Sequence, residues 1–158
     1  MLDAFTTLNP AWTSSVAFGD LVRCRFPDLL DYTRRTVRFC AGTEIDSHHG
    51  AVFLELVPAV PAAEQAPDTG DIFIDPAALA PTVAVDPDAL WLRPERADRF
   101  DTAHPGFLTD PFEGTPVVGR LYGEALTALE IAQARHRALR AAHMADWRTR
   151  RARRRRKG

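Results

Sequence analysis

Hydrophobic and polar residues alternate in short runs through the first two thirds of the chain. In the run VRCRF at 22–26, three apolar side chains alternate with two arginines, which is the two-residue period of a strand with one buried face. Further apolar runs, bounded by proline, glycine or aspartate, predict four more strands. The predicted strands are 19–26, 35–41, 51–57, 71–75 and 89–93.

A helical period replaces this alternation near the end of the chain. Apolar residues and two histidines recur there at spacings of three and four, which predicts one amphipathic helix over 121–145. Two polar segments, 42–50 and 94–119, are rich in turn residues, and we expect a hairpin connection at the first and irregular chain at the second. The predicted helical stripe is Leu121, Ala125, Leu129, Ala132, His136, Leu139, His143 and Trp147.

Short strands followed by a single helix predict a mainly β fold with a C-terminal helix. No strand–helix alternation is present, so a small antiparallel barrel or strongly bent sheet is favoured, with the helix as its cover. In the second predicted strand, Val37 and Phe39 are expected on one face and Arg38 and Cys40 on the other. The expected core includes Val22, Phe39, Leu54, Leu56, Ile72 or Ile74, and Leu90 or Leu92.

Composition places the chain among single-domain globular proteins. It has 158 residues, 46% of them hydrophobic and 26% charged, which is enough apolar material for one core. No run approaches the roughly 18 apolar residues of a membrane helix, and the first residues do not have the pattern of a signal peptide. Two cysteines cannot form a disulfide framework, and Cys24 and Cys40 are expected to be small buried hydrophobes. These features predict a cytoplasmic protein without contact to a membrane.

Charge is distributed very unevenly along the sequence. The net charge is −1, yet eight basic and no acidic residues lie in 148–158. The twelve other basic residues and all twenty-one acidic residues lie in 1–147, which therefore carries a net charge of −9. This asymmetry predicts a lead-in over 1–18, a barrel with its helix over 19–147, and a basic, disordered tail over 148–158.

Several motifs follow one another in an order that resembles a known family. A GDLV strand ends in Phe-Pro, an arginine opens the next strand, and an apolar strand ends at prolines. This order resembles the PemK/MazF family of toxin endoribonucleases, over about 20–131 of the chain. The matching stretches are GDLVRCRFP (19–27), RTVRFC (35–40), AVFLELVPAV (51–60), DIFIDP (71–76), VDPDALWLRPERADRF (85–100) and GRLYGEALTALEI (119–131).

The resemblance implies a small SH3-like barrel, usually a homodimer restrained by an antitoxin protein. Members of the family cleave single-stranded RNA without a metal ion, so no cofactor is implied. They use an arginine at the start of the second strand and a Ser or Thr hydroxyl after the proline that ends the third. Arg35 stands at the first position, followed by Thr36 where the family has proline, and Val60 stands at the second.

Val60, at the position where the family has Ser or Thr, changes the expected activity. The planar guanidinium of Arg35 suits a phosphate, whereas Val60 has no hydroxyl to donate to one. Loss of one preorganised donor typically costs on the order of 10²–10³ in rate. We therefore expect weak endoribonuclease activity or none. The alternatives are a catalytically silent nucleic-acid- or protein-binding barrel and an unrelated β-barrel adaptor.

Two groups of arginines are candidates for nucleic-acid binding. The first lies on the first two predicted strands and comprises Arg23, Arg25, Arg34, Arg35 and Arg38. The alternative for this group is a solvated strand face whose charges pair with Asp20, Asp28 and Asp31. The second group lies in the basic tail, where the alternative is folding onto an acidic surface of the same or a partner chain. It comprises Arg150, Arg151, Arg153, Arg154, Arg155 and Arg156.

The histidines are weaker candidates for chemistry. His48 and His49 are adjacent in a polar loop, where exposure to solvent is favoured over acid–base or metal chemistry. His104 precedes a proline and is expected in a loop, and His136 and His143 fit the boundary of the helical stripe. No spacing typical of a metal site is present, so no metal is expected.

Overall fold

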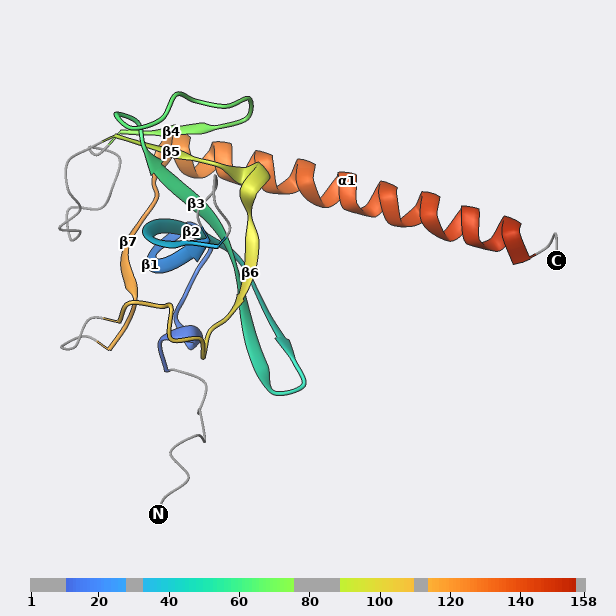
Figure 1. The fold of residues 1–158 in the computed structure, drawn as a ribbon, viewed down its shortest axis with the longest axis horizontal. Helices are drawn as coiled ribbons and strands as arrows, with labels where there is room; N and C mark the ends of the chain where they lie inside the picture. The colour runs from blue at the N-terminus through green and yellow to red at the C-terminus, as the bar shows by residue number, and fades with distance from the viewer. Residues whose placement is uncertain (1–10, 28–32, 76–88, 110–113, 156–158) are drawn as a thin grey trace, which may run out of the picture.

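The chain forms one curled antiparallel sheet with a single long helix at its C-terminal end (Figure 1). The structure, a computed structural model, describes residues 11–27, 33–75, 89–109 and 114–155. The predicted class, mainly β with a C-terminal helix, is confirmed. The elements in chain order are η1 (Ala11–Ser14), β1 (Asp20–Pro27), β2 (Arg35–His48), β3 (Ala51–Pro61), β4 (Ile72–Ile74), β5 (Leu90–Leu92), η3 (Pro94–Arg96), β6 (Asp98–Asp101), β7 (Val117–Arg120) and α1 (Gly123–Arg155).

The three longest strands form the centre of the sheet. Neighbouring strands follow the order β4-β5-β3-β2-β1-β7, and β6 also pairs with β3. Every pairing between the described strands is antiparallel. Because β3 pairs with β2 and β6 through its first half and with β5 through its second, the sheet bends around it.

Side chains of the central strands supply two cores, one on each face of the sheet. Successive strand residues point to opposite faces, so Leu21 and Val22 enter different cores. The inner core lies inside the curl and comprises Trp12, Val22, Cys24, Phe26, Cys40, Leu54, Leu56, Val60, Phe100 and Phe107. The helix-side core lies under α1 and comprises Leu21, Ala41, Val57, Ala59, Ile74, Leu90, Leu92, Leu121, Ala125 and Leu129.

Most of the predicted core is confirmed, but β2 buries the face opposite to the one expected. Val37 is 46% exposed, whereas Arg38 is only 9% exposed and lies on the face that carries Cys40. The cause is the register with β1, which pairs Arg38 with the inward-facing Cys24 and Val37 with the outward-facing Arg25. Phe39 is partly buried against the helix-side core.

The hairpin between β2 and β3 is longer than predicted. Residues 42–48, expected in a turn-rich connection, continue β2, and only His49 and Gly50 form the turn, both with positive φ. All residues from Glu44 to His48 are exposed, so this arm carries polar residues on both faces. Two further strands, β6 and β7, lie within the segment expected to be irregular.

Both ends of the predicted barrel also differ from expectation. Trp12, placed in the lead-in, is 6% exposed and its ring centroid lies 5.3 Å from that of Phe107 in the inner core. The helix continues to Arg155, so the expectation of disorder is wrong for 148–155, while 156–158 lie outside the described residues. Arginine has a high helix propensity, and the sequence contains no proline or glycine between Glu124 and Lys157.

The backbone of Gly19 lies close to the side chain of Leu126 at the point where α1 packs against the sheet. Gly19 precedes β1 with φ +84°, and a Cβ there would lie 2.5 Å from Cδ1 of Leu126. Leu121 and Leu129 are fully buried in the same region, each burial contributing about 2 kcal/mol. Glycine at position 19 therefore allows the first turns of the helix to seal the helix-side core.

The two cysteines are free and buried, as predicted. Cys24 and Cys40 are 1% and 0% exposed and lie in the inner core. Burial raises the pKa of Cys24 to about 11, although the nearby charge of Arg35 acts in the opposite direction. Burial likewise raises the pKa of Cys40. Both thiols are therefore protonated at neutral pH and behave as apolar core groups.

Candidate nucleic-acid interface

Three arginines share one exposed face of β1 and β2. Arg23 and Arg25 alternate with the inward-facing Cys24, and Arg25 lies directly opposite Val37. Arg35 is two residues before Val37, so it is the diagonal neighbour of Arg25, at about 7–8 Å in an antiparallel pair. We call Arg23, Arg25 and Arg35 the arginine face, and all three residues are exposed.

Among the described residues, none of the three arginines of this face forms an ion pair with a carboxylate. Asp20, one of the acids expected to neutralise them, instead accepts a hydrogen bond from Arg120 at 2.6 Å and one from the backbone N–H of Ala17 at 2.8 Å. Asp28 and Asp31 lie outside the described residues. Arginines elsewhere in the described part of the chain do pair with carboxylates, among them Arg93, Arg99, Arg120, Arg137, Arg140 and Arg150.

The other two arginines predicted on these strands are placed differently. Arg34 is exposed and immediately precedes β2. The prediction that Arg38 belongs to the binding face is wrong, because Arg38 is buried on the inner side of β2. Its charge acts there on the thiol of Cys40, where it opposes the larger effect of burial.

The structure does not bring Arg35 and Val60 together on one surface. Strand alternation places Arg35 on the outward face of β2, the face that carries Phe39. Val60 is 0% exposed and belongs to the inner core, where its neighbours on the sheet include Cys40. A hydroxyl introduced at position 60 would therefore meet the protein interior and not a phosphate bound at Arg35.

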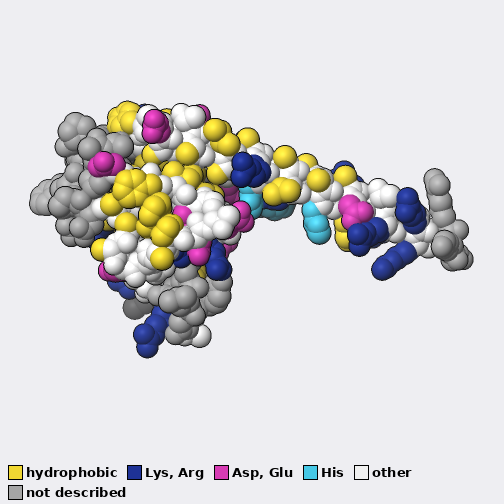
Figure 2. All heavy atoms as spheres, turned by 90° about the horizontal axis from the view of Figure 1, so that it is seen from above, with side chains coloured by type: hydrophobic (Ala, Val, Ile, Leu, Met, Phe, Trp, Pro, Cys, Tyr) yellow, Lys and Arg dark blue, Asp and Glu magenta, His cyan; other side chains and the backbone are white. Residues whose placement is uncertain are grey.

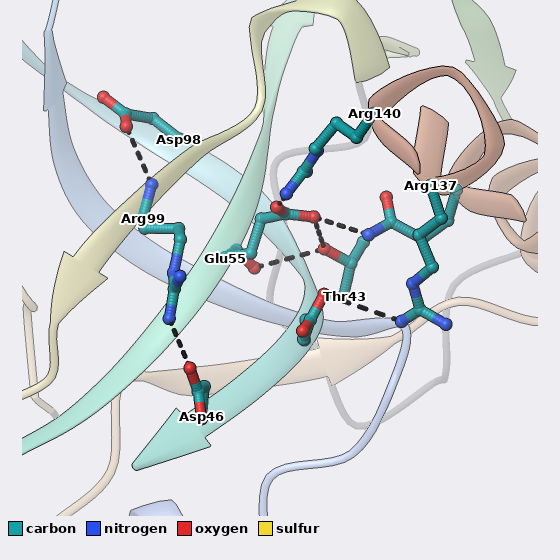
Figure 3. Close-up of polar contacts among 9 residues, drawn as sticks. Thr43, Asp46, Glu55, Asp98, Arg99, Arg137 and Arg140 are labelled. Carbon is teal, nitrogen blue, oxygen red and sulfur yellow. Dashed lines mark hydrogen bonds and ion pairs between the residues drawn. The ribbon is translucent and has the colours of Figure 1, made fainter. Parts of the chain in front are cut away.

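A buried carboxylate attaches α1 to the centre of the sheet (Figure 3). Glu55 of β3 is 3% exposed, and its Oε1 accepts hydrogen bonds from Thr43 Oγ1 at 2.8 Å and Gln133 Nε2 at 2.6 Å. Its Oε2 accepts a hydrogen bond from Arg140 at 2.8 Å. Burial alone would raise the pKa of Glu55, but the hydrogen bonds from Arg140, Gln133 and Thr43 outweigh it, so the pKa is lowered. The carboxylate is therefore ionised at neutral pH.

Beyond this attachment point α1 extends away from the curled sheet (Figures 1 and 2). Every residue from 141 to 155 is exposed, and Figure 2 shows Lys and Arg side chains concentrated toward the far end. We call residues 148–155 the basic helix end. Arg150 pairs with Asp146 one turn earlier, at 2.8 Å, but both side chains are more than half exposed. Such a pair is weak in water and leaves the segment strongly cationic.

The histidines occupy separate places. His48 ends β2 and His49 lies in the turn, with ring centroids 4.1 Å apart, so the two rings sit at the tip of the hairpin. His104 Nδ1 accepts a hydrogen bond from the backbone N–H of Gly106 at 2.9 Å. His136 is half-buried and His143 is exposed on α1. Within the described part of the chain, no three His, Cys, Asp or Glu side chains are grouped so as to hold a metal ion.

Sequence reasoning did not single out Glu55 or its partners. Glu55 is the single charged residue in the apolar run AVFLELV, which was the available signal. Its partners Gln133 and Arg140 lie 78 and 85 residues further along the chain, so their convergence depends on the fold.

Comparison with known proteins gives no further assignment. The sequence matches no protein-family model, and it has no significant similarity to a curated protein. Among the described helices, none has both the length and the apolar character needed to cross a membrane.

Proposed function

We propose that this chain is a cytoplasmic PemK/MazF-like barrel that binds single-stranded RNA and cleaves it weakly or not at all. The observation that carries the proposal is the arginine face, three exposed guanidinium groups without a carboxylate partner among the described residues. The body of the protein is acidic overall, so a patch of this kind is not a consequence of average composition. The planar guanidinium of arginine can bind two phosphate oxygens at once and keeps its charge at every working pH.

The basic helix end adds a second cationic surface. Neutralising phosphates with arginine releases counterions, which favours binding to any nucleic-acid strand and carries little sequence information. The arginine face and the basic helix end lie on different elements, so a strand that contacts both is held at two places. The resemblance also implies a homodimer and an antitoxin partner, and we include both in the proposal.

Cleavage needs more than a phosphate-binding cation. The 2′-hydroxyl must lose its proton, the pentavalent phosphate must be stabilised, and the leaving 5′-oxygen must be protonated. Arg35 supports charge stabilisation because it is exposed, and weak cleavage through Arg35 is the second candidate function. The burial of Val60 in the inner core argues for a catalytically silent barrel, because no hydroxyl faces the bound phosphate from that position.

Arg25→Ser tests the arginine face directly. We expect it to weaken binding of a short single-stranded RNA by about 5- to 10-fold, through the loss of one charge-assisted phosphate contact. Arg135→Ser removes the same charge from an exposed position on α1 and is the matched control. Equal losses in the two variants, measured by fluorescence anisotropy, would show that the arginine face has no special role.

Val60→Thr tests the catalytic reading. We expect no gain in RNA cleavage, and a fall of about 1–3 kcal/mol in the free energy of unfolding, because the new hydroxyl is buried among apolar groups. Val37→Thr makes the same change at a position that is 46% exposed, and should be nearly neutral. Cleavage that rises in Val60→Thr and disappears in Val60→Thr/Arg35→Ala would contradict the silent-barrel proposal and establish the family's catalytic pair.

A further inference from the structure

An exposed aromatic ring stands at the start of the basic helix end. Trp147 is 49% exposed, whereas Trp12 is buried and Trp91 half-buried. The guanidinium carbon of Arg151 lies 5.1 Å from the centroid of its ring. An aromatic side chain of this size is unusual on a freely exposed helical segment, because water contact with its apolar surface is unfavourable.

The helical conformation gathers arginines around this ring. Residues four apart lie on one side of an α-helix, about 6 Å apart along its axis, so Arg151 and Arg155 follow Trp147 in a row. Together with Arg148 and Ala152, these three residues line an open hollow of about 330 Å³ on the side of α1. A tail without regular structure would not hold the ring and the cations in this arrangement.

We infer that Trp147 is a stacking site for one unpaired nucleobase, with Arg148, Arg151 and Arg155 contacting the adjoining phosphates. The inference rests on the proposed RNA binding and adds what the arginines lack, a group that distinguishes a nucleic-acid strand from other polyanions. A base stacks on an aromatic face irrespective of its sequence, and arginine beside the ring adds a cation–π contribution. A paired base is already stacked within its duplex, so the site favours single strands.

The contact between Trp147 and Arg151 also stabilises the helix, but that role alone does not explain why the Trp147 side chain remains exposed to solvent. With Arg151 beside the ring, Trp147 is still 49% exposed to solvent. The remaining surface is apolar and flanked by cations, which is the chemistry that a base with its phosphate matches. RNA and single-stranded DNA both carry such bases, so the shared ligand is an unpaired nucleobase with its phosphates.

Binding of the full chain to three probes tests the inference. The probes are a short oligoadenylate RNA, the DNA strand of the same sequence, and inorganic polyphosphate of similar charge, which has no bases. Trp147→Leu should weaken binding of the RNA by about 5- to 100-fold and leave polyphosphate binding unchanged. Trp147→Phe, which keeps an aromatic face, should restore most of the loss. Leu139→Ala, at an apolar position that is 63% exposed on the same helix, is the matched control.

Each outcome separates this inference from the function on which it rests. A wild-type chain that does not bind RNA at all overturns both. RNA binding that is unchanged in Trp147→Leu overturns the stacking site alone, as does an equal loss for RNA and polyphosphate. Quenching of tryptophan fluorescence by oligoadenylate, present in the wild type and absent in Trp147→Phe, supports it. The DNA arm shows whether the 2′-hydroxyl contributes, since equal affinity for both strands indicates recognition of base and phosphate only.

Discussion

Glu55→Ala is expected to lower the free energy of unfolding by about 2–3 kcal/mol and to loosen α1 from the sheet. The substitution leaves Gln133 and Thr43 without their buried acceptor and removes the partner of Arg140. Removing one member of a buried, hydrogen-bonded charge pair costs several kcal/mol, and we take the lower part of that range because Arg140 is half exposed. Urea denaturation measures the change, and hydrogen exchange of 123–140 locates it.

Glu44→Ala is the matched control for this prediction. Glu44 also contacts α1, through Arg137 at 3.7 Å, but both side chains are about half exposed, so the expected cost is below about 0.5 kcal/mol. The pH dependence of stability tests the same assignment independently, because the pKa of Glu55 is lowered in the folded protein. The ionised Glu55 carboxylate contributes its full stabilisation above the unfolded carboxyl pKa of about 4.3, and this stabilisation is lost as the pH falls through the lower folded pKa. A wild-type chain and Glu55→Ala that respond identically to acid would contradict this assignment.

Deletion of 148–158 is expected to reduce the slope of log affinity against log salt for RNA binding by about five to six units. The segment carries eight basic residues, and for single strands the slope of log affinity against log salt is about −0.7 for each phosphate neutralised. We expect the affinity at low salt to fall as well, while the sheet and the first half of α1 stay folded, since every described residue of the segment is exposed. Titrations of the full chain and the truncated chain over a range of salt concentrations measure the difference.

A variant with the same length provides the control for truncation. Replacing Arg148, Arg151 and Arg155 by glutamine keeps a helical sequence but removes three charges, and should change the slope by about two units. A slope that the deletion leaves unchanged would mean that the basic helix end does not touch nucleic acid. An acidic partner surface would then be the favoured ligand of this segment.

The sequence predicted those strands that contain an alternating or continuous run of apolar residues. The alternation in 22–26 and the apolar run in 51–57 both lie in strands, and their inward residues occupy the inner core. For β2 the pattern VRFC was ambiguous, because apolar residues occur on both faces, and the pairing with β1 decides which face is buried. The short strands β4 (IFI) and β5 (LWL) were predicted because they are apolar throughout, whereas β6 (DRFD) and β7 (VVGR) contain too few apolar residues to form such a run.

The sequence predicted which arginines share a strand face, but not which carboxylates pair with them. Alternation alone placed Arg23 and Arg25 on one face, and this placement is confirmed. Whether that face was neutralised depended on Asp20, whose carboxylate is taken by Arg120, a residue 100 positions away. The burial of Arg38 and the attachment of α1 to Glu55 likewise depend on contacts between distant segments, which local patterns do not encode.

The fifteen residues of α1 from Ala141 to Arg155 set the reach of the protein through an equilibrium between helical and frayed conformations. They span about 22 Å when fully helical, yet a helix of this length is only marginally stable in water without tertiary contacts. The docked half of α1 supplies the nucleus, while arginines one turn apart, such as Arg151 and Arg155, repel each other and promote fraying. Counterions or bound phosphates cancel that repulsion. A polyanion bound at the end of the helix is therefore expected to extend it as well, so that the distance between the cations and the sheet would depend on what is bound.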